Sequence, residues 1–275
     1  MKRFDGLPMI ILLSVGRSSC GFGKRWRLFS MMIWQSARTD LHSAFWEMHV
    51  AAGLIEAGAT LVPRDRRTPR KSGPDLLCQI PYAWIEVVAA KPGSGRDAVP
   101  ESPEGVAYSV PDDQILLRIT QVIREKKAKR DTYLSKGWVR NSDPFVIAVN
   151  TGIVPNGKSE LPLPRIIRAV FPFGHFAVSM DVTSGRITDQ YYQYRSVITK
   201  VAGSPVSTAL FEDESYSGIS ACLYSVTDAF NPPRSWARSL VLVHNPLATA
   251  PLPRGCFCGV LEYWREDDRL HTPGP

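Results

Sequence analysis

Two carboxylates in apolar surroundings near the middle of the chain indicate metal chemistry. Asp75 follows Pro74 and opens the apolar run 76–80, and Glu86 lies inside the strand-like run 83–90. Ten residues separate the two acids, so two neighbouring strands can bring both side chains to one pocket. A buried carboxylate is unfavourable unless something pairs with it, and a divalent cation is a common partner. We therefore expect a site for Mg²⁺ or Mn²⁺ between them.

The composition indicates a globular protein with a full hydrophobic core. Of the 275 residues, 44% are hydrophobic and 21% charged, which is too apolar for a disordered chain. The net charge of +7 favours an anionic partner, although a solvated basic surface explains it equally well. Five scattered cysteines, with Cys256 and Cys258 as the only close pair, fit neither a disulfide framework nor a zinc site. We expect small buried thiols in a reducing compartment.

Residues 1–38 differ from the rest and are predicted to be an appendage. Lys2 and Arg3 precede the apolar stretch 7–13, which is the order of a short signal peptide. No clear small-residue cleavage site follows, and the stretch is too short to span a membrane. We expect a poorly ordered or loosely packed leader on a cytoplasmic protein without membrane association.

The next part of the chain predicts helix, strand, strand, strand, helix and strand. Apolar residues recur at helical spacing from Leu41 to Ala59, with Thr39 or Asp40 as the cap and Gly58 as the terminator. A second helix is predicted from about residue 109 to 134, with Gly137 as its stop. The strands are predicted over 59–62, 76–80, 84–89 and 145–149.

The second half of the chain is richer in strand patterns. Residues 176–181 and 186–192 predict a hairpin, and 219–224 and 240–243 predict two further sheet strands. No clear linker divides the chain. We therefore interpret 39–150 as the core and 151–275 as a β-rich extension packed on the same sheet, not an independent domain.

This order of elements, with Pro74-Asp75 and Glu86-Val87-Val88, resembles the PD-(D/E)xK nuclease superfamily. The resemblance covers about 41–150. The stretches 218–221 and 243–248 also resemble a pattern in uncharacterised bacterial proteins with this core. The resemblance implies an α/β restriction-endonuclease-like fold, a mixed β-sheet flanked by helices. It also implies that Asp75 and Glu86 are catalytic and bind Mg²⁺, often together with a glutamate from a helix.

Glu47 fits the role of the helical acid. Its neighbours on a helical wheel are Ala44, Ala51 and Leu54, so the carboxylate lies on an apolar shoulder and requires a partner. A salt bridge to an arginine is the alternative to a metal. We predict Glu47, Asp75 and Glu86 as the metal ligands.

The lysine that the superfamily places two residues after the strand glutamate is missing, because Val88 occupies that position. Lys91 faces the opposite side of the strand and can replace it only with a bulge. On the second helix, Gln114 and Arg118 form part of a polar stripe and are the predicted catalytic replacements. A solvated helix face is the alternative interpretation.

Two basic clusters flank the acids in this arrangement. We predict that they bind phosphates of a nucleic acid, although soluble surface charge is the alternative. The predicted nucleic-acid-binding residues are Arg64, Arg66, Arg67, Arg70, Lys71, Lys126 and Lys127.

The sequence thus predicts a metal-dependent nuclease-like protein that hydrolyses phosphodiester bonds, with DNA as the expected partner and a homodimer as one possible assembly. The alternative is a catalytically inactive relative that binds a nucleic acid or a protein. The missing lysine keeps this alternative open, whereas the retained acids favour the enzyme.

Overall fold

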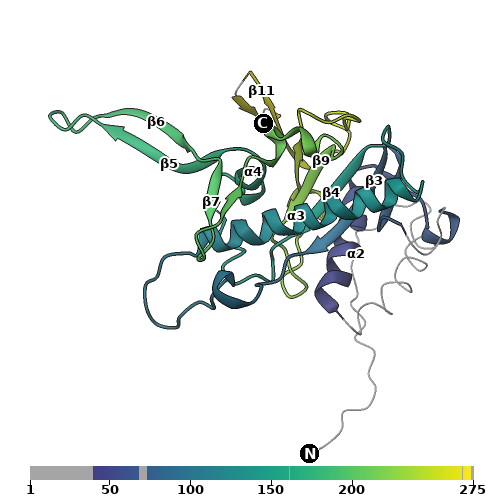
Figure 1. Cartoon of the computed structure of the whole chain (residues 1–275), viewed down its shortest axis with the longest axis horizontal. Coiled ribbons are helices and arrows are strands. Elements are labelled where there is room, and N and C mark those ends of the chain that lie inside the picture. The colour runs from purple at the N-terminus through teal and green to yellow at the C-terminus, as the bar shows by residue number, and fades with distance from the viewer. Residues whose placement is uncertain (1–39, 68–72, 161, 268, 274–275) are drawn as a thin grey trace, which may run out of the picture.

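The computed structural model describes residues 40–67, 73–160, 162–267 and 269–273 (Figure 1). The expected N-terminal appendage, 1–38, lies outside the described residues, as do Arg70 and Lys71 of the first basic cluster.

One large mixed sheet forms the centre of the molecule, as predicted. Eight strands lie in the order β1-β2-β3-β4-β9-β10-β11-β12, so the second half of the chain continues the sheet of the first half. β3, β4 and β9 are parallel neighbours, and Glu86 on β3 lies opposite Ile147 on β4. The strands are β1 (Thr60–Leu61), β2 (Leu76–Ile80), β3 (Tyr82–Ala89), β4 (Phe145–Asn150), β9 (Ala221–Ser225), β10 (Val241–His244), β11 (Leu261–Glu266) and β12 (Arg269–His271).

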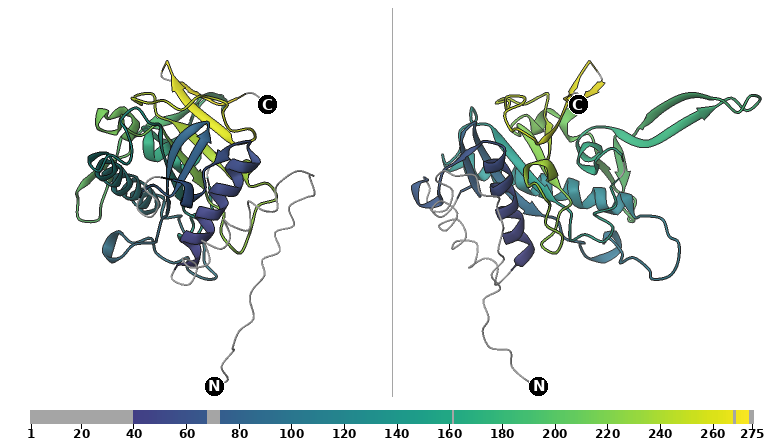
Figure 2. Two further views of the ribbon diagram at one scale, coloured as in Figure 1. Left: turned by 90° about the vertical axis from the view of Figure 1, so that its right-hand side faces the viewer. Right: turned by 180° about the vertical axis from the view of Figure 1, so that it is seen from behind.

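Helix α2 (Leu41–Glu56) covers one face of the sheet (Figure 2). The Asp40 side chain, one of the two caps that the sequence allows, accepts a hydrogen bond from the Ser43 N–H at 3.1 Å. The buried Trp46 indole donates to the Ala148 carbonyl at 3.0 Å, which fixes the helix against β4. No helix among the described residues, α2 included, combines the length and the hydropathy needed to cross a bilayer.

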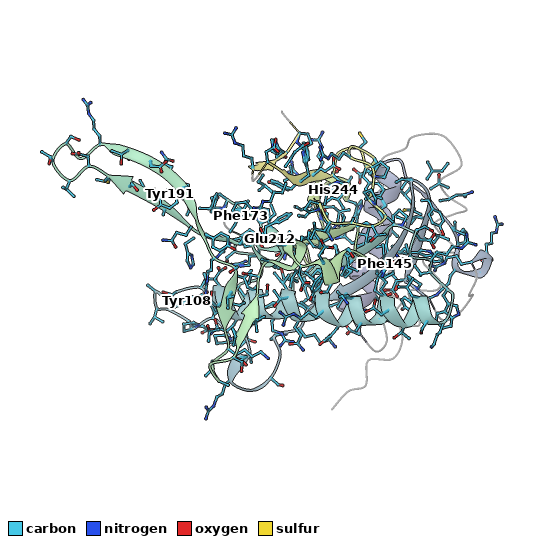
Figure 3. The ribbon with its side chains drawn as sticks, turned by 45° about the horizontal axis from the view of Figure 1, so that its top comes forward. Tyr108, Phe145, Phe173, Tyr191, Glu212 and His244 are labelled. Atoms are coloured by element: carbon cyan, nitrogen blue, oxygen red, sulfur yellow. The ribbon has the colours of Figure 1, made fainter. Side chains whose placement is uncertain are left out.

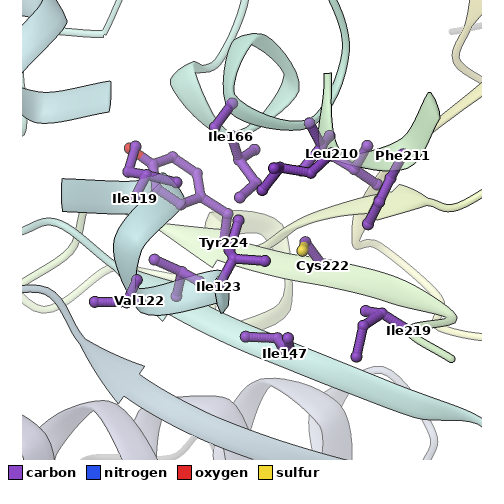
Figure 4. Packing of buried hydrophobic residues seen from close by; sticks show 14 of the residues in the cluster. Ile119, Val122, Ile123, Ile147, Ile166, Leu210, Phe211, Ile219, Cys222 and Tyr224 are labelled. Atoms are coloured by element: carbon purple, nitrogen blue, oxygen red, sulfur yellow. The ribbon is translucent and has the colours of Figure 1, made fainter. Parts of the chain in front are cut away.

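Helix α3 (Asp112–Ser135) and the short α4 (Arg165–Val170) lie on the other face, where α3 packs Ile119 and Ile123 over β4 and β9 (Figure 4). Side chains alternate along β3, so Trp84 and Val88 join the core on the α3 side and Ile85 and Val87 join that on the α2 side. Glu86 therefore faces α3.

A buried ion cluster fixes the start of α3. Arg165 and Arg168 on α4 are both 1% exposed, and both contact the carboxylate of Asp112. The Arg165 Nε lies 2.7 Å from one oxygen and the Arg168 guanidinium 2.6 Å from the other. Two buried cations on one carboxylate hold the first turn of α3 against α4.

The predicted hairpin is present as a long arm that projects from the body of the molecule. It consists of β5 (Phe173–Met180) and β6 (Ile187–Tyr194), and Tyr191 lies on it well away from the sheet (Figure 3). Phe176, Met180 and Ile187 are exposed along the arm. A smaller hairpin of β7 (Val197–Thr199) and β8 (Pro205–Ser207) lies beside α3. Short 3₁₀ helices lie at Arg64–Arg66, Gly95–Asp97, Leu210–Glu212, Glu214–Tyr216 and Ala237–Ser239.

Candidate active site

Glu86 is fully buried in the middle of β3, and cations from α3 neutralise it. One carboxylate oxygen, Oε1, accepts from Lys126 Nζ at 2.7 Å and from Lys129 Nζ at 2.6 Å. The other, Oε2, accepts from the Tyr133 hydroxyl at 3.1 Å. The three donors are spaced three and four residues apart, which aligns them on one side of α3. The contacts of both lysines with Glu86 therefore depend on how α3 packs against β3.

The two lysines differ in their access to solvent. The Lys126 side chain is 17% exposed and that of Lys129 is 45% exposed. Burial opposes the charge on Lys129, but the hydrogen bond and the negative charge of Glu86 outweigh it and raise the pKa of this ammonium. Lys129 therefore stays charged while its outer surface faces water.

Asp75 lies directly before β2, at the end of the β2–β3 ladder. Leu76, the first residue of β2, pairs with Ile85 of β3. One residue earlier in the chain, the Asp75 Oδ2 accepts a hydrogen bond from the Val87 N–H at 2.7 Å. Burial and the negative charge of Glu86 raise the pKa of Asp75, against the effect of that hydrogen bond. The carboxylate is thus held in place but lacks enough positive charge around it.

Glu47 brings a third carboxylate to the same neighbourhood from α2. Burial raises its pKa to about 7, and the negative charges of Asp75 and Glu86 add to the shift. The cations of Arg64 and Arg67 act in the opposite direction but do not cancel it. The acids on α2, directly before β2 and on β3 therefore share one electrostatic environment, and two of them are short of a cation.

Arg67 has a structural role beside the acids. It is 5% exposed, and its guanidinium donates to the carbonyls of Pro74 at 3.1 Å and Asp75 at 2.8 Å. Burial, with the nearby charge of Arg64, lowers its pKa to about 10. The Arg67 side chain thus positions the Pro74-Asp75 segment. The sequence predicted instead that Arg67 contacts a nucleic-acid phosphate, but the side chain is buried.

The other predicted site residues are spread more widely. Gln114 and Arg118 lie nearer the start of α3, and Arg118 Nε donates to the Lys91 carbonyl at 3.1 Å. The Lys91 ammonium pairs with Asp40 at 3.0 Å, and Lys127 pairs with Asp131 at 3.2 Å. Arg64 and Arg66 belong to the 3₁₀ turn after β1.

Sequence reasoning assigned Lys126 to the nucleic acid, counted Lys129 only among the basic residues near the end of α3, and did not place Tyr133 in the site. The spacing of the two lysines and the tyrosine along α3 was the available indication, because it aligns all three on one side of the helix. Which side of α3 faces Glu86 follows only from the packing of the helix on β3.

The donor set suits a hard divalent cation, since it consists of carboxylate oxygens. Among the described residues, however, no three His, Cys, Asp or Glu side chains already converge as a metal cage. Glu86 is turned toward the two lysines, and one oxygen of Asp75 is bound to the Val87 N–H. A cation at this site therefore has to compete with the lysines for Glu86.

The ionisation of Glu47 is expected to destabilise the metal-free protein as the pH rises. Its pKa is raised from 4.5 to about 7, so between these values the folded chain binds more protons than the unfolded chain. The free energy of unfolding then falls as the pH rises through this window. Glu47→Gln, which cannot ionise, should lose this slope and be more stable than wild type by about 1–3 kcal/mol above neutral pH. Urea unfolding across the window measures this, and equal slopes in both proteins would contradict it.

Comparisons with protein-family models, with curated proteins and with solved structures give no match for this chain. The function is therefore argued from the geometry of the site.

Proposed function

We propose that the protein is a metal-dependent phosphodiesterase that cleaves DNA, with a core of the PD-(D/E)xK, restriction-endonuclease-like type. One observation carries this proposal. Lys126 and Lys129 reach Glu86 from α3, and Glu86 precedes Val88 by two residues on the same face of β3. In this proposal the two lysines take the role of the lysine that is absent at position 88.

Each residue of the site has a chemical role in this proposal. Glu47, Asp75 and Glu86 would hold Mg²⁺ or Mn²⁺. When bound, such a cation stabilises charge on phosphoryl oxygens and lowers the pKa of a water. Water adds to phosphorus, the bond from phosphorus to the leaving oxygen breaks, and the leaving oxygen takes up a proton.

Lys129 is the residue that reaches the substrate in this scheme. Its side chain is nearly half exposed, whereas Glu86 and most of Lys126 are enclosed. A phosphate at the mouth of the site can therefore contact the Lys129 ammonium, while Lys126 and the Tyr133 hydroxyl keep Glu86 oriented. A preorganised cation beside the phosphate stabilises the charge that develops during attack.

A catalytically inactive relative that only binds nucleic acid or protein is the second candidate. The hydrogen bonds of Glu86 favour this second candidate, because two ammonium groups and a hydroxyl already occupy the carboxylate. In that case the cluster would be a structural ion network between β3 and α3. The two proposals differ in whether a divalent cation displaces Lys129 from Glu86.

Lys129→Met is expected to slow Mg²⁺-dependent cleavage of DNA by about 10²-fold, the effect typical of losing one charge-stabilising donor. The assay measures nicking of supercoiled DNA and degradation of single-stranded DNA, with Mg²⁺ and with EDTA. Arg186→Met on the exposed turn of the arm is the matched control and should cut at the wild-type rate. A wild-type protein that binds DNA but cuts none of it with Mg²⁺ would establish the binding module instead.

A further inference from the structure

A second basic site lies on α3 beyond the acids. It is a pocket of about 370 Å³ lined by the loop after β3, by α3 and by the β7–β8 hairpin. Three of its lining side chains are cations, namely Arg118, Arg124 and Lys200, and one is the carboxylate of Asp97. Its size is within the range of pockets that bind small molecules or parts of larger ligands.

The carboxylate of this pocket is already engaged, because Asp97 Oδ1 accepts the Val201 N–H at 2.8 Å and so fixes the β7–β8 turn. Arg118 and Lys200 have no ion pair with any described residue. Arg124 makes a weak contact with the Ser207 carbonyl at 3.5 Å and also interacts with the Tyr216 hydroxyl, which carries no negative charge to neutralise it. The pocket therefore contains more positive charge than its own groups neutralise, which is the condition for binding an anion.

The loop is shaped to hold Arg118 in place. The Arg118 Nε donates to the Lys91 carbonyl at 3.1 Å, and the guanidinium lies against Gly93. A Cβ at Gly93 would lie 2.7 Å from an Arg118 nitrogen, and the glycine has a φ of +89°. The positive φ favours glycine, and a larger residue at this position would displace the guanidinium from its place against the loop. The remaining guanidinium N–H groups make no hydrogen bond among the described residues and can form a fork toward a phosphate.

The pocket and the acid site are in line along α3. Arg118 and Lys129 are eleven residues apart, which is about three helical turns, so they lie on nearly the same side at a separation of about 16 Å. A strand of B-form DNA covers this length in about five nucleotides at about 3.4 Å each. Glu125 is the one acidic residue between Arg118 and Lys129 on α3. Its Oε1 accepts a hydrogen bond from Gln121 Nε2 at 2.7 Å.

We propose that the pocket of Arg118, Arg124 and Lys200 binds a phosphate of the nucleic-acid strand several nucleotides from the cleaved bond. This inference rests on the proposed function, because it assumes that a nucleic acid lies along α3. The phosphate is either an internal diester or the terminal phosphate of a strand end. The pocket is thus a positioning site that contacts substrate without taking part in bond breaking.

Equilibrium binding of labelled oligonucleotides in EDTA tests the inference without depending on cleavage. Single- and double-stranded oligonucleotides with and without a 5′-phosphate are titrated against the full chain at several salt concentrations. Arg118→Met/Lys200→Met should raise the Kd about tenfold or more and lower the slope of log Kd against log salt by about 1–2. Arg186→Met/Arg269→Met, which removes two exposed cations elsewhere, is the matched control and should bind as wild type does.

The outcomes separate the two proposals. An equal loss of affinity for all oligonucleotides assigns the pocket to an internal phosphate, and a loss confined to the 5′-phosphorylated ones assigns it to a strand end. If wild type binds and the pocket variant, shown folded by its thermal unfolding, binds equally well, the pocket inference is wrong and the proposed function stands. If wild type binds none of the oligonucleotides, the nucleic-acid function itself is wrong.

Discussion

Asp75→Asn is expected to lower the rate of Mg²⁺-dependent DNA cleavage by about 10³-fold, which corresponds to about 4 kcal/mol of transition-state stabilisation. The substitution removes one negative oxygen ligand and leaves the shape of the side chain unchanged. The amide oxygen can still accept the Val87 N–H, which the carboxylate accepts at 2.7 Å. The measurement is the rate of nicking of supercoiled DNA under single-turnover conditions.

The stability of the same variant is its internal control. Burial and the charge of Glu86 raise the pKa of Asp75, so the ionised carboxylate is unfavourable in the folded chain without metal. Asp75→Asn should therefore unfold at the same temperature as wild type or above it. Loss of cleavage with unchanged or higher stability assigns the carboxylate to catalysis. Cleavage at the wild-type rate would exclude Asp75 from the site.

Glu86→Leu is expected to lower the free energy of unfolding by about 3 kcal/mol, because it leaves two ammonium groups facing an apolar side chain. Lys126 is the more affected of the two, since it is only 17% exposed, whereas Lys129 can turn toward water. Tyr133 also loses its acceptor on Glu86. Urea or thermal unfolding at neutral pH in EDTA measures the effect.

A triple variant provides the matched control. Adding Lys126→Met and Lys129→Met to Glu86→Leu replaces the whole ion cluster with apolar groups, which is often close to neutral for stability. The triple variant should therefore regain most of the stability that Glu86→Leu loses. A loss below about 1 kcal/mol in Glu86→Leu alone would mean that the cluster contributes little to the fold.

The sequence predicted the elements whose patterns are long or strongly apolar. The helical repeat from Leu41 and the cap at Asp40 correspond to α2, and the polar–apolar helix after residue 109 corresponds to α3. The apolar runs correspond to β2, β3, β4, β9 and β10. These patterns reflect burial of one side of a helix or both faces of a central strand, which can be recognised without tertiary information.

Several short or charged elements, α4 and β11 among them, were not predicted. α4 has six residues and includes two buried arginines, both of which pair with Asp112, and Arg165 also pairs with Glu160. β11 carries Glu262, whose carboxylate is buried against His244 of β10. Because β11 was not predicted, this buried pair could not be foreseen. In each case a distant partner makes the burial possible, so the local pattern indicates a surface segment.

The sequence indicated that the three acids lie near one another, but it did not indicate which cations contact them. Asp75 and Glu86 are recognisable because they interrupt apolar strands, and Glu47 because it lies on an apolar shoulder. The contacts of Lys126 and Lys129 depend on how α3 is rotated and shifted over β3, which helical periodicity does not determine. Gln114 and Arg118 were chosen from the same helix, but they lie two to four turns too early to reach Glu86.

The central claim, that α3 supplies the cations of a phosphodiester-cleaving site, is tested most directly by one comparison. The rate of supercoiled-DNA cleavage with Mg²⁺ is measured for wild type and for Lys126→Met/Lys129→Met, with DNA binding and thermal unfolding recorded for both. We predict that wild type cuts in Mg²⁺ and not in EDTA, and that the double variant binds DNA but cuts at least about 10³-fold more slowly. Equal cutting by both proteins, or no cutting by a folded wild type that binds DNA, would contradict the claim.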